Sequence, residues 1–450
     1  MKHLGQPGFW FPVALLVVAA LGSAALQSEH CRHLSERDRT SYGMMPVWRA
    51  RFDAMSATCG VGLMLYDLQA DYTPTGRWVL VGLGLAGALL YLTAARQVIE
   101  ALWSGAKPLP RVRVVLAAFL VWQILAVLLA WILERASGTG GAWRTTAWNA
   151  IAAFASLGWL EPATNPRATW IYAFIGVLGA LGWTAWLLPV PALVRRYVRL
   201  RSLLVLVATW CAFLAVSAAL ITALEMPRGA ARGPAPDRRL AGAPTGARYA
   251  RSLVQVAAAA SAGMPTEELK ERGVSEGTKV VLSGVVLVGG LGGAAGGGIR
   301  WPMLLALLAV AGVFGRRPAG LRDEGARRGA LAAVACVVAL VSLVLVVALG
   351  LLVIEARTTT AFQSAPTLGD ALLDATSAVA GGNLSSGLMA TVTSANLSRG
   401  IHQSVDLYQY GLVWLLAAMF ISRTLPVLIL ARCAAVRGDA EASRLPPTLI

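Results

Sequence analysis

The stretch "FDAMSATCGVGL", from Phe52 to Leu63, lies between two long apolar runs and is itself only half apolar. Its small residues suit a short helix, and the two glycines near its end favour a tight turn. A helix needs about 20 apolar residues to cross a bilayer, so this stretch is too short to span one. It is therefore either a half-span that stops inside the protein or a glycine-rich turn between two helices.

Three later stretches share this design, and each also lies between two long apolar runs. They follow at intervals of about 100 residues, which is what a repeated unit with loops of variable length produces. Their turn residues are Gly158, Gly263 and the pair Gly382-Asn383, against Gly62 in the first stretch. The three stretches are "WNAIAAFASLGWL" (148–160), "LVQVAAAASAGM" (253–264) and "LLDATSAVAGGNLSSGL" (372–388).

The composition is typical of a membrane protein. Of the 450 residues, 57% are hydrophobic and 14% are charged, whereas soluble domains contain about 25% charged residues. The net charge of +16 would suit nucleic acid, but the Lys and Arg residues form short clusters between apolar runs. Such clusters mark cytoplasmic loops, so the patterning argues against nucleic acid as a partner and predicts a protein embedded in a lipid bilayer.

Eight apolar runs are long enough to be considered as spans, and their length and continuous apolarity favour helices over barrel strands. The first run is near the lower length limit, and a cleaved signal peptide is the alternative to the uncleaved span that we expect. The runs are Phe9–Leu26, Trp78–Leu102, Val114–Leu133, Trp170–Val194, Leu203–Leu224, Lys279–Val313 (interrupted), Ala330–Ile354 and Leu407–Ala431.

Spans and short elements alternate, which predicts an all-α membrane protein. Four repeated units of helix, pore loop and helix are expected to surround a pseudo-fourfold central pore. The units are expected over residues 1–105, 106–198, 199–320 and 321–450, with a broken helix in the third and a cytoplasmic tail in the fourth.

The basic clusters predict the orientation in the membrane. Short basic connections follow every second span, which places the N- and C-termini in the cytoplasm of a multi-pass protein of the cell (plasma or inner) membrane. The segment Pro227–Gly246, expected on the other side, is also basic, so the asymmetry is incomplete. The basic residues are Lys107, Arg111 and Arg113; Arg195, Arg196, Arg199 and Arg201; Arg316, Arg317, Arg322, Arg327 and Arg328; and Arg432 and Arg437 in the tail.

Four half-spans in one chain favour a pore. Non-helical backbone at membrane depth is tolerated only inside protein or beside water, and rings of backbone carbonyls can replace the hydration shell of a permeating cation. Residues 58–62, TCGVG, also fit the T-x-G-x-G pattern of a potassium-channel filter, although one such match is weak. The alternative is close packing of small residues between membrane helices.

Two of the apolar runs contain residues that are unusual in a membrane helix. Residues 289–298 contain seven glycines, and because each costs about 1 kcal/mol in a helix, the sixth run is expected to be broken. A glycine packing surface is the alternative. Arg423 lies about 16 residues into the last run, where a charge normally faces a cavity or a partner; snorkelling to the interface is the alternative.

These motifs resemble the Trk/Ktr/HKT superfamily of cation transporters, in the form of an eight-span Ktr-type membrane subunit. "SATCGVGLMLYD" resembles the first pore loop of that family, "GGLGGAAGGGIR" (Gly289–Arg300) its third-repeat glycine segment, and "MFISRTLP" (Met419–Pro426) its last-helix motif with Arg423 at the arginine. The resemblance implies K⁺ as the transported ion, a homodimer and a cytosolic ring of nucleotide-binding regulatory subunits.

The resemblance also assigns residues to the filter and to the gate. The expected filter consists of Cys59, Gly60, Val61, Gly62, Ser156, Leu157, Gly158, Ser261, Ala262, Gly263, Gly381, Gly382 and Asn383. The expected gate consists of Gly289, Gly290, Gly292, Gly293, Gly296, Gly297, Gly298 and Arg423.

Departures from the family pattern leave other readings open. The second loop lacks the family's asparagines, the third lacks its arginine, and Asn383 stands at the ring position of the fourth unless the register slips onto Gly382. Na⁺ or non-selective conduction, and a non-transporting scaffold or sensor, are therefore the alternatives. The four His and five Cys residues show no catalytic or metal spacing, so neither an enzyme nor a bound cofactor is expected.

Overall fold

The computed structural model describes residues 7–32, 45–65, 68, 71–102, 110–139, 141–158, 166–197, 200–226, 244–261, 274–291, 298–310, 324–358, 367–382, 384 and 403–442. These residues are helical apart from connecting turns and one isolated bridge between Arg32 and Tyr72. Six of the described helices are long and apolar enough to cross a membrane. The protein is therefore an all-helical membrane protein.

The described helices are grouped here, in chain order, by the four units proposed from the sequence. The first unit contains α1 (Pro7–Leu26), α3 (Met45–Cys59) and α4 (Pro74–Leu102). The second contains α5 (Val112–Ala136), α6 (Trp143–Phe154), α7 (Pro166–Ala180), α8 (Trp183–Trp186) and α9 (Pro191–Tyr197). The third contains α10 (Leu200–Leu224), α11 (Thr245–Ser261), α12 (Glu276–Val288) and α13 (Trp301–Val310), and the fourth α14 (Glu324–Thr358), α15 (Leu368–Ala380) and α17 (Gln403–Ala442).

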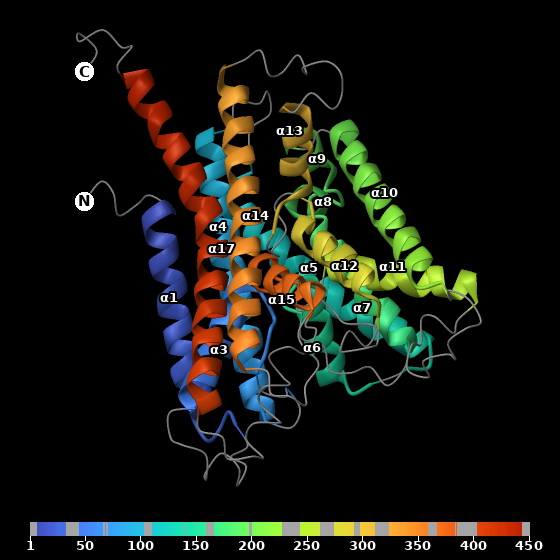
Figure 1. Cartoon of the computed structure of the whole chain (residues 1–450). Helices are drawn as coiled ribbons and strands as arrows, with labels where there is room; N and C mark the ends of the chain where they lie inside the picture. Colours follow the sequence, from blue (N-terminus) through green and yellow to red (C-terminus); the bar gives the residue numbers. More distant parts are fainter. Residues whose placement is uncertain are drawn as a thin grey trace.

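The four units close into a ring. Helix α4 contacts α5, α7 contacts α11, α12 contacts α15, and α17 returns to pack on α3 and α4 of the first unit. Figure 1 shows α1, α17 and α14 standing side by side, with the start of α1 and the end of α17 at the same end of the molecule. We call the short helices α3, α6, α11 and α15 the half-helices, since each stops inside this ring.

Burial separates the inner from the outer surface of the ring. Buried apolar clusters fill the junctions between units, around residues such as Phe154, Trp210 and Met419. The outward faces of the long helices are apolar yet exposed, as Leu21 (68%), Val216 (67%) and others show. An apolar face without protein cover is the surface that a helix presents to lipid.

The fourth apolar run is broken, and the expectation of one continuous span over Trp170–Val194 was wrong. Helix α7 ends at Ala180, Gly182 takes a left-handed φ of 75°, and α8 and α9 follow as short pieces. Indole groups replace the lost helical bonds: Trp186 Nε1 donates to the Leu178 carbonyl at 3.1 Å, and Trp122 Nε1 to the Trp186 carbonyl at 2.8 Å. Freed backbone groups at membrane depth need such partners.

The sixth run is broken as predicted. Helix α12 ends at Val288, Gly289 follows with a φ of 59°, and α13 begins at Trp301. We call residues 289–300 the intramembrane loop; within it, residues 292–297 lie outside the described residues. Its ends are held by bonds from Ile299 N to Leu287 O (2.7 Å), from Trp301 N to Gly290 O (3.2 Å) and from Trp210 Nε1 to Gly289 O (3.1 Å).

Candidate functional site

Three half-helices end in the same turn. Beyond the end of α3, α6 and α15, one backbone N–H donates to the carbonyl five residues earlier, a closure typical of a helix that stops at a left-handed residue. The bonds are Val61 N to Ser56 O (2.9 Å), Leu157 N to Ala152 O (2.8 Å) and Gly382 N to Ser377 O (3.2 Å). Gly382 thus corresponds to Val61 and Leu157, and Asn383 follows in sequence at the position of Gly62 and Gly158.

The turn residues themselves have positive φ angles. Gly60 (63°), Ser156 (57°) and Gly381 (74°) occupy equivalent positions, and Ser156 is the one non-glycine residue with positive φ in the described part of the chain. Gly62 (83°) and Gly158 (76°), two residues after Gly60 and Ser156, also have positive φ angles. A serine in this conformation is strained, so the surrounding structure must impose it. Of the other expected filter residues, Ala262, Gly263 and Asn383 lie outside the described residues.

Two of the half-helices rest against a glycine of the next helix. A Cβ added to Gly87 of α4 would lie 1.8 Å from the Thr58 carbonyl oxygen, and one added to Gly179 of α7 would lie 2.0 Å from the Phe154 carbonyl oxygen. No side chain fits there, because real Cβ contacts stay beyond 3 Å. We call Gly87 and Gly179 the seat glycines. The sequence analysis missed them, although Gly87 lies among the spaced glycines of "GLGLAG" (82–87).

A buried carboxylate braces the first turn. Asp53 is fully buried in α3; its Oδ1 accepts from the Leu65 N–H at 2.9 Å and its Oδ2 from the Tyr72 hydroxyl at 2.7 Å. It therefore ties the half-helix to the chain that leaves the turn, at Leu65 and again at Tyr72, just before α4 begins. Asp374 of α15 stands at the equivalent position and is 2% exposed.

The second and third units are braced from their outer helices instead. Glu134, near the end of α5, accepts from Thr146 Oγ1 of α6 and the Tyr172 hydroxyl of α7, each at 2.5 Å. Glu225, just after α10, accepts from the Ser275 N–H at 2.7 Å and from Thr278 Oγ1 at 2.6 Å. Both carboxylates join the first long helix of a unit to its second.

A buried lysine joins the third unit to the fourth. Lys279 of α12 is 1% exposed, and its Nζ lies 2.6 Å from Asp370 Oδ1 of α15 and 2.8 Å from Glu276 Oε1. Asp370 also forms the capping box at the start of α15 with Thr367. The outer end of this half-helix is thus anchored by charge.

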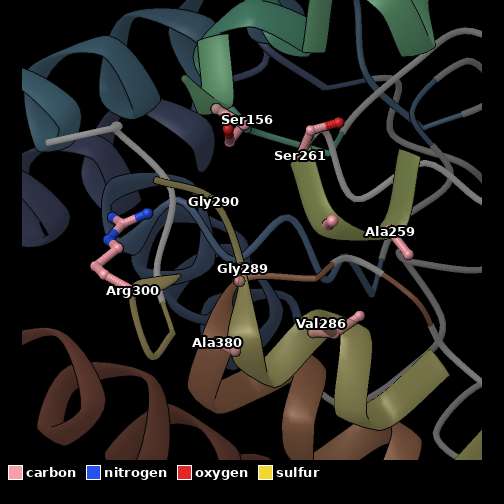
Figure 2. A pocket seen from close by; sticks show the side chains of 11 residues that line it. Ser156, Ala259, Ser261, Val286, Gly289, Gly290, Arg300 and Ala380 are labelled. Atoms are coloured by element: carbon pink, nitrogen blue, oxygen red, sulfur yellow. The ribbon is translucent and has the colours of Figure 1, made fainter. Parts of the chain in front are cut away.

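The half-helix ends enclose a small cavity above the intramembrane loop. Figure 2 shows Ser156 and Ser261 on one side of it, Val286 and Ala380 on another, and Gly289, Gly290 and Arg300 along the loop. The cavity therefore receives residues from the second, third and fourth units at once. Helix C-termini carry partial negative charge, so the three that converge on this cavity offset part of the positive charge of Arg300, which also lines it.

The first and fourth units enclose a second cavity together with Gly298 of the third unit, and this cavity contains Arg423. It is lined by Cys59, Val61, Tyr91, Gly298, Val379, Gly381, Ser422, Arg423 and Pro426. Arg423 is 4% exposed; its guanidinium carbon lies 4.1 Å from the centre of the Tyr91 ring, and its Nη2 lies 3.5 Å from where a Cβ on Gly60 would be. The side chain therefore lies against the first turn and does not snorkel to the interface.

Arg300 is a second buried cation at this depth, which the sequence analysis did not select. It ends the intramembrane loop, is 7% exposed, lines the first cavity, and has its guanidinium carbon 5.8 Å from the Tyr91 ring centre. The available signal was a basic residue two positions after a glycine run, inside an apolar stretch.

The two helix breaks contact each other. The Leu291 N–H of the intramembrane loop donates to the Ala180 carbonyl at the end of α7, at 2.8 Å. A Cβ on Gly290 would lie 2.7 Å from that same oxygen. The break in α7 thus supplies an acceptor for the loop, an arrangement that neither sequence run predicts alone.

Comparison with known proteins identifies the fold. No family model matches this chain, and no curated protein matches it. Among solved structures, the chain is similar to the potassium transporter TrkH from Vibrio parahaemolyticus, with a TM-score of 0.65 and 16% sequence identity. The match covers 99% of this chain and 86% of that one. The chain therefore has the fold of a TrkH-type potassium transporter along essentially its whole length.

Proposed function

We propose that this protein carries monovalent cations across a membrane, with K⁺ as the preferred ion. The observation that supports this most is the repeated turn at the ends of three half-helices, which converge on cavities inside a closed ring of helices. Carbonyl groups at such turns are suitable ligands for a dehydrating cation. The TrkH-like fold supports the same function.

In this proposal the turns form the filter and the intramembrane loop forms the gate. The filter comprises residues 59–62, 156–158, 261–263 and 381–383. The gate comprises the glycines of residues 289–298 together with Arg423. A permeating ion would leave the filter into the cavity lined by Ser156, Ser261 and Gly289, where the loop and the arginine charges limit its passage.

The finer assignment is a Ktr-type membrane subunit with both termini in the cytoplasm. Its support is the common end at which α1 begins and α17 ends, together with the basic clusters expected on that side. A homodimer and a cytosolic nucleotide-binding ring belong to this assignment, with the lipid bilayer as the surrounding phase.

Flux measurement tests the proposal directly. Purified protein in liposomes should take up Rb⁺, as a K⁺ tracer, faster than Na⁺. Equal rates would replace the K⁺-selective filter by a non-selective one, and a reversed order would make Na⁺ the carried ion. Absence of any flux from folded protein would favour a non-transporting scaffold.

Two substitutions test the filter assignment. Gly62→Ser should reduce Rb⁺ uptake and Asn383→Gly should change the Rb⁺ to Na⁺ ratio, because both alter the same proposed ring. Gly138→Ser is the matched control, since Gly138 also has a positive φ (70°) but lies in open space outside the site. Unchanged flux and selectivity in both filter variants would contradict the assignment.

A further inference from the structure

Tyr91 lies between two buried arginines that come from different units. It belongs to α4 of the first unit, whereas Arg300 ends the intramembrane loop of the third and Arg423 belongs to α17 of the fourth. The two guanidinium carbons lie 5.8 Å and 4.1 Å from the centre of its ring. Both distances are within the roughly 6 Å over which an aromatic ring attracts a cation.

The arrangement places two like charges close together at membrane depth. Arg300 and Arg423 are 7% and 4% exposed, so water screens neither of them well. Two local features favour Arg423 there: the face of the Tyr91 ring, and the C-terminal end of α3, whose carbonyls carry partial negative charge. Arg300 shares the ring but lies farther from it.

We propose that Tyr91 is a positioning residue that holds the guanidinium groups of Arg300 and Arg423 beneath the filter, where their charge opposes the passage of a cation. This inference rests on the proposed transport function and extends it to a residue outside the intramembrane loop. A cation that leaves the filter meets the field of both guanidinium groups.

The alternative is that Tyr91 only fills space. Its ring also packs against Phe11 at a centroid distance of 6.2 Å, and it lines the second cavity beside Cys59 and Val61. A packing role depends on volume, whereas a positioning role depends on the aromatic face. Phe retains that face, whereas Leu and Met fill much of the volume without it.

The flux test uses Tyr91→Phe, Tyr91→Leu and Tyr91→Met in liposomes. Tyr91→Phe should behave as the wild type, whereas Tyr91→Leu and Tyr91→Met should raise Rb⁺ uptake by roughly tenfold, the scale of a lost desolvated cation–π contact. In a protein that also carries Arg300→Gln and Arg423→Gln, the difference between the Phe and Leu variants should disappear, because both charges to be positioned are gone. Equal uptake by the Phe, Leu and Met variants would overturn the proposal.

A second measurement does not depend on conduction. Cys59 is buried and shares the second cavity with Tyr91 and Arg423. In a protein carrying Cys31→Ala, Cys211→Ala, Cys336→Ala and Cys433→Ala, a small methanethiosulfonate reagent should label Cys59 faster in Tyr91→Leu than in Tyr91→Phe. If Cys59 is labelled faster in Tyr91→Leu than in Tyr91→Phe but the protein carries no ions, Tyr91 has the positioning role and the transport function is rejected. If the protein carries ions but the labelling rate and the Rb⁺ uptake are the same in Tyr91→Phe and Tyr91→Leu, only the positioning role is rejected.

Discussion

The first and second units build the same turn from different residues. In both, an N–H beyond the half-helix reaches back to a carbonyl five residues earlier, and a seat glycine lies under the half-helix end. The turn residue, however, is Gly60 in one and Ser156 in the other. The backbone path is therefore imposed by packing beneath the turn, because the serine adopts it against its own preference.

The braces of the two units also differ. The first unit uses Asp53 within the half-helix itself, whereas the second uses Glu134 from the outer helix α5. The position of Asp53 is taken by Asn149 in the second unit, which is also buried. The same turn is thus braced by Asp53 in the first unit and by Glu134 in the second. Substitutions can show which contacts of each carboxylate stabilise the fold and which affect ion selectivity.

The seat glycines should give the largest effect. Gly87→Ala and Gly179→Ala each drive a methyl group into a backbone carbonyl, so the half-helix must shift or the protein must unfold. We expect destabilisation of about 3 kcal/mol or more, together with loss of ion flux, in both units. Thermal unfolding, monitored by size-exclusion chromatography, measures the destabilisation. Rb⁺ uptake into liposomes measures the loss of ion flux.

Gly82→Ala is the matched control for this experiment. Gly82 lies in the same helix as Gly87, and nothing is within 4 Å of a Cβ placed there. Alanine should be neutral or stabilising by up to about 1 kcal/mol, since it is the better helix former. If Gly87→Ala resembles Gly82→Ala, packing does not impose the turn.

The braces should give an intermediate effect that differs between the units. Asp53→Ala leaves the Leu65 N–H and the Tyr72 hydroxyl without their acceptor, which costs about 1–3 kcal/mol. Because Leu65 follows the first turn directly, the ratio of Rb⁺ to Na⁺ uptake should fall as well. Glu134→Gln should lower stability while leaving that ratio nearly unchanged, since its partners lie on helices.

Tyr72→Phe separates the two halves of the Asp53 brace. It removes the bond to Oδ2 and retains the bond to the Leu65 N–H, so stability should fall by about 1 kcal/mol with the uptake ratio retained. An uptake ratio that falls as far in Tyr72→Phe as in Asp53→Ala would mean that the contact with Tyr72, and not the contact with Leu65, controls the filter.

The turn residue should give the smallest effect. Ser156→Gly releases the strain of a positive φ and should stabilise the protein by about 1 kcal/mol, whereas Gly60→Ser should destabilise it by a similar amount. Unfolding midpoints of both variants, with Gly138→Ser as the control for a serine at positive φ in a free loop, measure the difference. Destabilisation by Ser156→Gly would show that the hydroxyl group makes a needed contact.

Local features of the chain were sufficient to predict the overall plan. Run length and apolarity indicated the six spans that the described helices contain, but not the break in the fourth run. The seven glycines of residues 289–298 indicated the broken sixth run, and small residues before a glycine indicated the half-helix ends. Each of these depends on the solvation and backbone freedom of neighbouring residues, which a sequence displays directly. The position of Arg423 at membrane depth could also be predicted in this way, from its place inside an apolar run.

The remaining features depend on residues that are far apart in the chain and meet only when the ring closes. The break at Gly182 is stabilised by Trp122, the strained φ of Ser156 lies above the seat at Gly179, and the break of α12 docks on Ala180. The pairing of Arg300 and Arg423 on Tyr91 unites three units. Contacts of this kind are decided by shape and charge across helix packing, so only the folded ring specifies where the strain and the buried charges lie.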